Sequence, residues 1–345
     1  MLFTDSETQR LLRTTAKSFL ANAYPIDRLY RIESGEEQIT AADLDEMAEL
    51  GWFDLLAADG DGASLLETAV VIEELGYAGV SSPVLPANVA AYAFASAGRA
   101  DLDARCTISE GARLRAEKSS LVIKNGVVSG TLRLVPFADL SERVLAPAIV
   151  NAEPALVVLP LSGTHIEPLA LMDRRCYSNV RFDNAKADVL ATGADAEALI
   201  EQLDALSTAF GVIEMAGMMQ RILEMTTEHV TTRQQFGQPI GKFQAARHRA
   251  ADILVQLDTT RWAAYHALWL FENDPSRTDE IYLAKHWAIR AVDRVFQNTH
   301  MLHGGVGVGM EHPLHLFTQG MTALAVRGGT MSETVTHTLA YLKTA

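Results

Sequence analysis

Several features that define whole classes of protein are scarce or missing in this sequence of 345 residues. Its two cysteines, Cys106 and Cys176, have no paired spacing, which argues against a disulfide framework or a metal site. No apolar run is long enough to cross a bilayer. Basic residues are few, with 29 lysines and arginines against 43 acidic residues and a formal charge of −14. This balance does not suit a protein that binds nucleic acid or a membrane surface.

The N-terminal residues 1–19 are amphipathic and include Asp5 and Glu7, which is not typical of a signal peptide. Neither an internal repeat nor a low-complexity segment is visible. Hydrophobic residues make up 48% of the chain, enough for a large core. The length suggests two or three domains. We therefore expect a cytoplasmic protein with a well-packed interior and no metal.

The first part of the chain, residues 1–105, reads as a helical domain. Residues 4–7, Thr-Asp-Ser-Glu, have the form of a capping box at a helix start. We expect the apolar face of that helix to contain Leu11, Leu12 and Phe19.

Glycines predict where two further helices of this domain end. Thr40 begins a helix that Gly51 stops, within the break Leu50-Gly51-Trp52. A later helix through an apolar run ends at Gly76. Residues 59–62, Asp-Gly-Asp-Gly, predict a plain turn, because the remaining ligand positions of a calcium loop are missing.

Residues 106–195 change to short β-rich runs separated by proline and glycine, which predicts a small β-barrel or sandwich. The predicted strands contain residues 121–123, 127–132, 144–146, 155–159 and 178–182.

Residues 196–345 return to helical periodicity and predict a four-helix bundle. Two of its helices flank residues 233–243, where Gly237, Pro239 and Gly241 favour a turn. We expect this bend to display Arg233, which can hold a phosphate with two parallel hydrogen bonds, and Phe236, which can cover an aromatic base. The apolar faces of the flanking helices contain Leu199, Leu203, Leu206, Phe210 and Ile213, and Ile253, Leu257, Ala264, Leu268 and Phe271.

The bend, Arg233-Gln-Gln-Phe-Gly-Gln-Pro-Ile-Gly-Lys-Phe-Gln244, resembles the Arg-x-x-Phe-Gly-x-Pro-Ile-x-x-Phe-Gln pattern of the acyl-CoA dehydrogenase family. The order of helical block, β block and bundle is also similar, so the resemblance covers essentially the whole chain. It implies an α+β fold of the acyl-CoA dehydrogenase type and FAD as cofactor. It also implies desaturation of an acyl-CoA thioester between its α and β carbons, with electron-transfer flavoprotein as the acceptor.

The resemblance implies which residues bind the cofactor. In the family the bend, here with Arg233, Phe236 and Gln244, contacts the pyrophosphate and adenine half of an FAD held mainly by the neighbouring subunit. The run from His303 through Gly304-Gly305 looks like a bacterial branch of the family, whose glycines let the backbone approach the FAD phosphates. Thr330, in the loop before the last helix, completes the set. The alternative is that Arg233 caps a carbonyl and Phe236 belongs to the core. For Gly304-Gly305 the alternative is a helix C-cap and turn.

The carboxylate that removes the substrate α proton is missing from both places where the family has it. One place is the loop before the last helix, which here reads Arg327-Gly328-Gly329-Thr330. The other lies on an upstream helix, at Ser207. A serine without an adjacent base cannot remove this proton.

Other family features are absent as well. Met301 replaces a glutamine that reaches the FAD in many members. Of the Thr-Glu-x-x-x-Gly-Ser-Asp segment that shapes the flavin and thioester site, only residues 107–110, Thr-Ile-Ser-Glu, remain.

Two acids and two histidines are candidates for a displaced base. Glu214 lies seven residues after Ser207, and its alternative role is that of a buried structural acid. Glu333 has the capping-box spacing from Thr330, which accounts for it without catalysis. We expect His303 and His312 to be packing or interface residues.

We interpret the sequence as the non-catalytic subunit of an α2β2 acyl-CoA dehydrogenase, of the kind found among bacterial enzymes that act on steroid side-chain CoA thioesters. It would complete the FAD site of a catalytic partner that supplies the glutamate. One alternative is an active homotetramer that uses Glu214 as the base. Another is a flavin-free scaffold, for which Arg233 at the bend would have no use.

Overall fold

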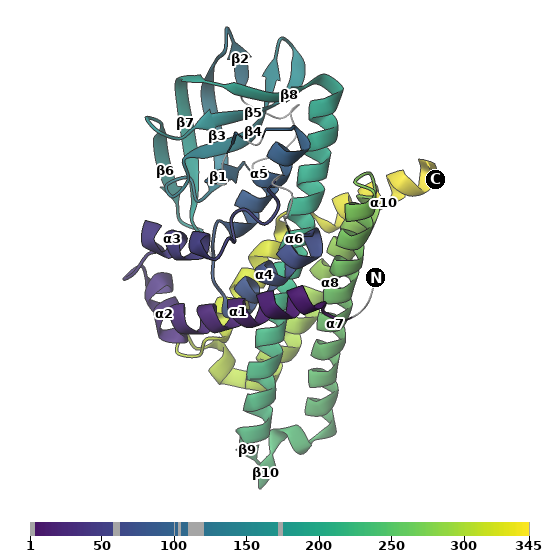
Figure 1. The fold of residues 1–345 in the computed structure, drawn as a ribbon. Coiled ribbons are helices and arrows are strands. Elements are labelled where there is room, and N and C mark those ends of the chain that lie inside the picture. Colours follow the sequence, from purple (N-terminus) through teal and green to yellow (C-terminus); the bar gives the residue numbers. More distant parts are fainter. Residues whose placement is uncertain are drawn as a thin grey trace. The chain divides into compact units, whose positions relative to one another are not determined.

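The computed structural model describes residues 4–57, 63–99, 101–102, 105–109, 121–171 and 175–344. The chain forms two compact units. The first comprises Met1–Gln38, Ala69–Val80 and Thr208–Ala345, and the second Ile39–Thr68 and Ser81–Ser207. The helical N- and C-terminal parts and the central mixed sheet confirm the predicted α+β class (Figure 1). The three domain boundaries drawn from the sequence stay a prediction, and the expected turn at 59–62 lies outside the described residues.

The first unit is helical. It contains most of α4 and α6 together with α1, α2 and all elements from β9 to the C-terminus (Figure 1). Their bounds are α1 (Glu7–Ala23), α2 (Ile26–Ser34), α4 (Leu65–Ala78), α6 (Gly193–Thr232), β9 (Gln234–Gln235), β10 (Gln238–Pro239), η2 (Ile240–Lys242), α7 (Gln244–Asn273), α8 (Asp279–His303), η3 (Gly304–Val308), α9 (Leu314–Val326) and α10 (Met331–Thr344).

Helix α1 begins at a different capping box from the one predicted. The Ser6 hydroxyl accepts a hydrogen bond from the Gln9 backbone N–H at 3.1 Å, and the Ser6 N–H donates to the Gln9 side chain at 2.8 Å. The box expected at Thr4 and Glu7 is therefore wrong. The Ser-x-x-Gln pattern two residues later satisfies the same backbone donors.

The buried face of α1 also differs from the expected one. Leu11 is 68% exposed, whereas Ala16 and Leu20 are buried. Leu12 and Phe19 are half-buried at the margin of this face. The three large apolar residues Leu11, Leu12 and Phe19 do not form the buried face of α1, which contains the smaller Ala16 together with Leu20.

Two glycines allow α4 and α6 to cross with their backbones in contact. A Cβ added at Gly76 would lie 2.2 Å from the carbonyl oxygen of Glu214. A Cβ added at Gly217 would lie 2.0 Å from the carbonyl oxygen of Glu73. The prediction that the helix ends at Gly76 is wrong, because this glycine serves the crossing. The helix ends before Gly79, which has a φ of +72°.

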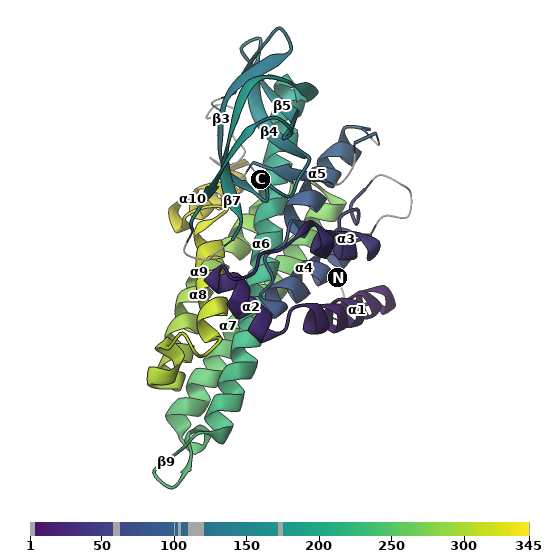
Figure 2. The same ribbon diagram turned by 90° about the vertical axis from the view of Figure 1, so that its left-hand side faces the viewer.

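The predicted hairpin of helices around residues 233–243 is confirmed. In Figures 1 and 2, α6 and α7 run side by side to the hairpin of β9 and β10. The expected apolar positions are all buried: Leu199, Leu203, Leu206, Phe210 and Ile213 on α6, and Ile253, Leu257, Ala264, Leu268 and Phe271 on α7.

Helix α8 connects the last two helices to the rest of the first unit. The Tyr282 ring stacks on His337 of α10 with ring centres 4.1 Å apart. The buried Lys285 donates from Nζ to the carbonyl of Leu324 on α9 at 2.7 Å. This bond satisfies a carbonyl in the last turn of α9.

The second unit contains helices α3 (Ala41–Glu49) and α5 (Val84–Ser96) and an eight-stranded sheet. The strand order is β6-β7-β3-β2-β4-β5-β8, and β1 also pairs with β4. The pairs β1–β4 and β2–β4 are parallel and the others are antiparallel. The strands are β1 (Cys106–Ile108), β2 (Val122–Lys124), β3 (Val127–Pro136), β4 (Arg143–Val150), β5 (Glu153–Pro160), β6 (His165–Leu169), β7 (Tyr177–Lys186) and β8 (Asp188–Thr192).

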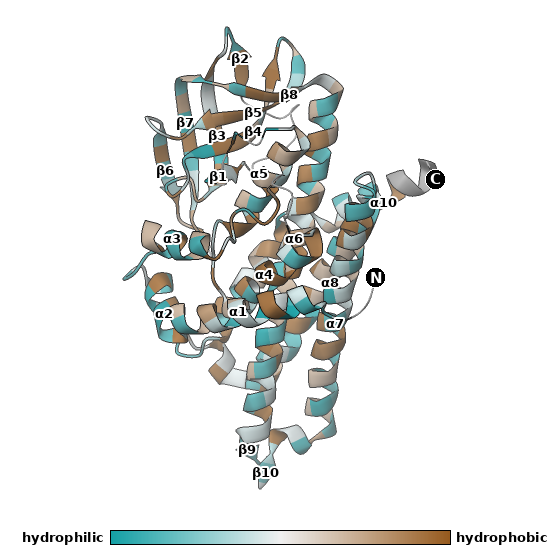
Figure 3. Cartoon of the chain, viewed as in Figure 1, coloured by the Kyte–Doolittle hydropathy of each residue, from teal (hydrophilic) through white to brown (hydrophobic). Residues whose placement is uncertain are grey.

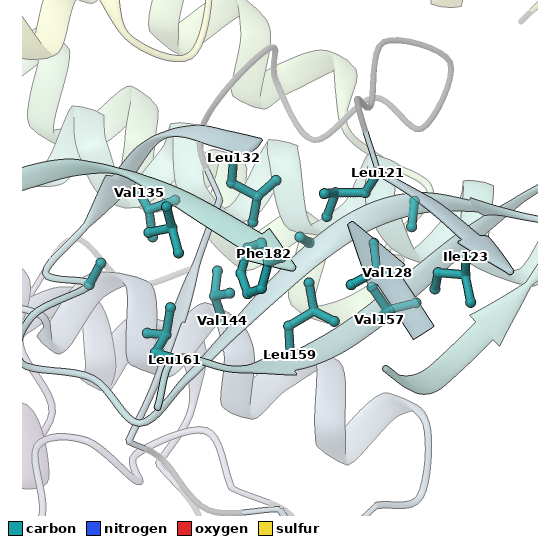
Figure 4. Close-up of a cluster of buried hydrophobic side chains, with 14 of the residues drawn as sticks. Leu121, Ile123, Val128, Leu132, Val135, Val144, Val157, Leu159, Leu161 and Phe182 are labelled. Carbon is teal, nitrogen blue, oxygen red and sulfur yellow. The ribbon is translucent and has the colours of Figure 1, made fainter. Parts of the chain in front are cut away.

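The core of the sheet consists of alternating side chains from β3, β4, β5 and β7. Val144, Val157, Leu159 and Phe182 lie together in it (Figure 4), and all four are buried. Hydrophobic colour runs along β5 in Figure 3, in agreement with its five successive buried residues. All five predicted strands are present.

Asn88 of α5 fixes the break that follows α3. Its amide nitrogen donates to the Trp52 carbonyl at 2.7 Å, and its oxygen accepts from the Leu56 N–H at 3.2 Å. Gly51 has a φ of +70°, and Thr40 caps the start of α3, as predicted.

The crossing of α4 and α6 predicts opposite effects for two glycines of the same helix. Gly217→Ala should lower the free energy of unfolding by at least about 1–3 kcal/mol, the usual cost of overpacking. Gly211→Ala is the matched control, because a Cβ there meets nothing within 4 Å, and alanine stabilises a helix by up to about 1 kcal/mol relative to glycine. Urea unfolding of both variants measures the difference. Equal stability of the two would contradict the crossing.

Candidate functional site

The bend between α6 and α7 is a tight β-hairpin. The backbone N–H of Ile240 donates to the Arg233 carbonyl at 2.9 Å. Phe236 and Gly237, between the two strands, have φ of +54° and +78°. Positive φ at both positions is what a type I′ turn requires. A phenylalanine in this conformation is strained, and such strain clusters at functional sites.

Phe236 stands at the tip of this hairpin with 91% of its surface exposed. Its ring meets Phe243 edge to face, with centres 6.1 Å apart and planes at 87°. The alternative that Phe236 belongs to the core is therefore wrong. An exposed aromatic ring held by a second ring suits stacking against a flat ligand.

Arg233 and Gln244 lie at the two ends of the hairpin and both are exposed. Across the described residues the Arg233 guanidinium has no hydrogen bond or ion pair, so the carbonyl-capping alternative finds no support. Its five N–H donors are available to an anion.

The hairpin packs closely on α6 and is tied to α7 by one side chain. A Cβ at Gly241 would lie 2.9 Å from the carbonyl oxygen of Val230. Arg247 donates from Nε to the Gly241 carbonyl at 2.9 Å. These contacts fix the path of the chain from η2 into α7.

Gly304 and Gly305 follow directly on α8 and expose their backbone. Gly304 has a φ of +59°, which favours glycine. A Cβ at either residue would meet nothing within 4 Å. The space over this segment is open, but the Gly304 N–H already donates to the His300 carbonyl as the C-cap of α8.

A pair of stacked histidines joins the hairpin end of α6 to the glycine end of α8. The rings of His229 and His303 lie 4.5 Å apart with an interplanar angle of 22°. His312 meets His303 at a ring distance of 5.0 Å. Burial, with the neighbouring imidazoles, lowers the pKa of all three rings. The stack brings Arg233 and Gly304 to one end of the helical unit.

Thr330 is not part of this end. Its hydroxyl donates to Glu333 at 2.7 Å and its backbone N–H to the same oxygen at 3.0 Å, which confirms the capping-box interpretation of Glu333. Four residues on, Thr334 contacts His286 of α8 at 3.2 Å. About 26 Å of helix separates His286 from His303. Figures 1 and 2 show α10 and the hairpin well apart.

The loop between α9 and α10 has a backbone that suits glycine alone. Gly328 and Gly329 have φ of +65° and +123°. A Cβ at Gly328 would lie 2.7 Å from Oγ1 of the buried Thr208. A carboxylate side chain at position 328 would therefore require Thr208 to move, and one at position 329, the other place where the family resemblance could put it, would meet an unfavourable φ. Ser207, at the other expected position, has a buried hydroxyl without a hydrogen-bond partner among the described residues.

Glu214 is buried, with 5% of its surface exposed, as the structural interpretation of this acid expects. Its backbone forms the α4–α6 crossing at Gly76. Of the other residues named from the sequence, Met301 is 63% exposed, Thr107 donates to the Pro136 carbonyl at 2.6 Å, and Glu110 lies outside the described residues.

Sequence reasoning missed a buried charge network in the helical unit. Glu73 accepts from Arg13 at 3.0 Å, Arg261 at 2.6 Å and Tyr265 at 2.9 Å. Glu74 accepts from Arg13 at 2.8 Å, and burial raises its pKa. The network lines a pocket of about 370 Å³. Two adjacent acids directly after the apolar run 69–72 of α4 were the available signal.

Comparison with known proteins assigns the chain to one family. The N-terminal domain of acyl-CoA dehydrogenases matches residues 6–107, and the C-terminal domain matches residues 207–340. The chain belongs to the acyl-CoA dehydrogenase family, whose general activity is the FAD-dependent desaturation of acyl-CoA thioesters.

Curated relatives and solved structures agree with this assignment. The acyl-CoA dehydrogenase FadE27 of Mycobacterium tuberculosis is 29% identical over 300 residues, which is 79% of each chain. The acyl-CoA dehydrogenase IpdE2 of the same organism is 28% identical over 335 residues, or 91% of each chain. The fold is similar to that in the ChsE4–ChsE5 complex of M. tuberculosis, with a TM-score of 0.85 at 24% identity over both full chains. Among the described residues, every helix is too short or too polar to cross a membrane.

The hairpin end fits the adenine and pyrophosphate half of FAD. Arg233 offers unpaired donors, Phe236 an open ring face, and Gly304 and Gly305 an uncovered backbone. The Gly328 loop fits the cofactor less well, because the Thr330 hydroxyl already donates to Glu333.

The lowered histidine pKa values predict that the chain loses stability as the pH falls below about 6.5, the ordinary pKa of histidine. The unfolded state then binds protons that the folded state does not, so the free energy of unfolding drops by up to about 1.4 kcal/mol per pH unit for each ring kept neutral. Urea unfolding between pH 7.5 and 5.5 measures this slope. His312→Asn should make it shallower, because Asn cannot titrate and can still accept the hydrogen bond that His312 accepts from the Leu314 N–H. The exposed His248→Ala is the control and should keep the slope. Stability that rises toward pH 5.5 would refute the prediction.

Proposed function

We propose that this chain is an acyl-CoA dehydrogenase subunit that completes the FAD site of a catalytic partner and does not itself remove the substrate α proton. The partner would be a homologous subunit in an α2β2 assembly. The substrate would be an acyl-CoA thioester, and electron-transfer flavoprotein would accept the electrons.

The observation that carries this proposal is the contrast between two ends of the helical unit. At the hairpin end, Arg233, Phe236 and Gly304 are exposed, and the Arg233 guanidinium has no hydrogen bond or ion pair among the described residues. At the other end, Gly328 and Gly329 have positive φ and no side chain, and Gly328 packs on Thr208, so this loop offers no general base. A carboxylate within hydrogen-bond reach of the α proton is indispensable to this chemistry.

In this proposal the residues of the chain bind and orient, and the partner supplies the base. Arg233 would hold a pyrophosphate oxygen with charge-assisted hydrogen bonds. Phe236 and Gln244 would contact the adenine half, and the backbone at Gly304 and Gly305 the phosphates. The chemistry that FAD supplies when bound is acceptance of the hydride from the β carbon.

The similarity to the ChsE4–ChsE5 complex supports the heteromeric form, because that relative is a complex of two differently named chains. The active homotetramer that uses Glu214 remains the alternative, and so does a flavin-free scaffold. Flavin content and the behaviour of Arg233 and Glu214 variants separate the three.

Arg233→Ala should weaken FAD binding to the assembled protein by roughly 2–5 kcal/mol, the cost of removing one partner of a buried charge pair. Arg233→Lys should recover only part of this loss, because Lys lacks the two-pronged geometry. The flavin absorbance per assembly after co-expression with a homologous partner measures the effect. The control is Arg10→Ala, which removes an exposed arginine from α1. Unchanged flavin content in Arg233→Ala would show that the hairpin is only structural, as in a scaffold.

Glu214→Gln should leave turnover in the heteromer nearly unchanged, since Gln keeps the size and one acceptor. Loss of a true general base typically lowers the rate by about 10²- to 10⁴-fold. Dye reduction with an acyl-CoA, at matched flavin content, measures turnover. Replacing the catalytic glutamate of the partner should abolish it. An inactive Glu214→Gln complex with bound flavin would favour the homotetrameric alternative.

A further inference from the structure

The histidine stack occupies a special position in the helical unit. The Arg233 N–H donates to the His229 carbonyl at 2.9 Å, so His229 lies one helical turn before the arginine. His303 is the last residue of α8 and precedes Gly304 directly. The ring contact between His229 and His303 therefore joins the residues next to the hairpin to those next to the glycine segment.

We propose that His229 and His303 are positioning residues that set the spacing between Arg233 and Gly304-Gly305, and that they do so only while both rings are neutral. Protonation of the pair would move the two segments apart and weaken the hold on the FAD of the neighbouring subunit. This inference rests on the proposed function, because it takes these two segments as the FAD-contacting surface.

The hydrogen bonds of His303 favour one neutral tautomer. Its Nδ1 lies 3.0 Å from the Thr299 carbonyl oxygen, which only accepts, so Nδ1 carries the proton. Its Nε2 is buried without a partner among the described residues. A second proton on Nε2 would be a buried donor with no acceptor, which is costly.

The groups that face the pair do not stabilise a positive charge. The rings are surrounded by Arg233, which directly follows α6, by His300 of α8 and by His312, which precedes α9. Burial is the main reason that the pKa of both rings stays low. The two nearby acids act elsewhere: Glu228 on His312, and Glu33 of α2 on His315 of α9 at 3.9 Å. Glu311 turns its carboxylate toward Gly309, and Tyr30 of α2 donates to the Glu311 carbonyl and lies against His315.

A face-to-face imidazole pair with two charges would repel itself in this setting. Two protonated rings with centres 4.5 Å apart repel each other, and this repulsion falls when the rings move apart. Because His229 is only half-buried, its end of α6 can move toward solvent, and the hairpin would move with it. The structure thereby links the protonation of two rings to the geometry of a surface that neither ring forms.

The test is the rate of FAD release from the assembled flavoprotein, followed by flavin fluorescence after dilution at pH 7.5 and pH 5.5. It applies equally to an assembly with a partner subunit and to one of this chain alone, because a neighbour's FAD is contacted in both. The wild type should release FAD roughly tenfold faster at pH 5.5 than at pH 7.5. A ring that the structure keeps neutral one pH unit below the ordinary histidine pKa changes the equilibrium by at most about tenfold, which sets this limit.

Two variants of one residue separate positioning from plain packing. His229→Phe keeps an aromatic ring against His303 but cannot be charged, so it should release FAD slowly at both pH values. His229→Ala removes the stack and should release FAD about two- to tenfold faster already at pH 7.5. His165→Phe, which removes an exposed imidazole from β6, is the control and should keep the wild-type pH profile.

The outcomes distinguish this inference from the proposed function. A wild-type pH profile in His229→Phe, or a wild-type release rate in His229→Ala, overturns the positioning role. If Arg233→Ala also leaves FAD release unchanged, the proposed FAD surface itself is wrong. Far-ultraviolet circular dichroism at both pH values confirms that each variant is folded, and His229→Phe keeps the test decisive if His229→Ala is not.

Discussion

The helical unit depends on the backbone contact of α4 with α6. Gly76 and Gly217 have no side chain to hold the two helices apart, so the acids of α4 lie in the interior. Glu73 is tolerated there because two arginines and a tyrosine donate to it. Arg13 also donates to one oxygen of Glu74, whose other oxygen is buried without a hydrogen-bond partner among the described residues. Beyond the crossing, α6 continues as a rigid rod for about 24 Å to the hairpin. The site is thus displayed far from the packing that supports it.

A short β-hairpin at the end of α6 is enough to expose the candidate ligand-binding residues, because α6 itself is fixed by the crossing with α4. A type I′ turn presents Phe236 outward, while Gly241 packs against α6 and Arg247 of α7 bonds the Gly241 carbonyl. The edge-to-face contact with Phe243 orients the Phe236 ring before any ligand arrives. Preorganisation of this kind reduces the entropic cost of binding.

The sequence predicted long-range features better than local ones. Helical periodicity identified α6 and α7, and the motif at 233–244 located the hairpin, because both signals extend over many residues. The strands β1, β6 and β8 were missed, since strands of three to five residues are too short to show a clear alternation and form only through pairing with neighbours. Gly76 was mistaken for a helix stop because a packing glycine and a stop glycine look alike without the partner helix. The histidine stack unites residues 74 positions apart, a pairing that no local pattern reveals.

The packing of Gly328 on Thr208 couples two positions that lie far apart in the sequence. A side chain placed at position 328 would meet an unfavourable φ and the hydroxyl of a buried threonine at once. Replacing Thr208 by a smaller residue would remove the second obstacle and leave the first. A design that places a carboxylate in this loop must therefore change the loop backbone and the α6 position together.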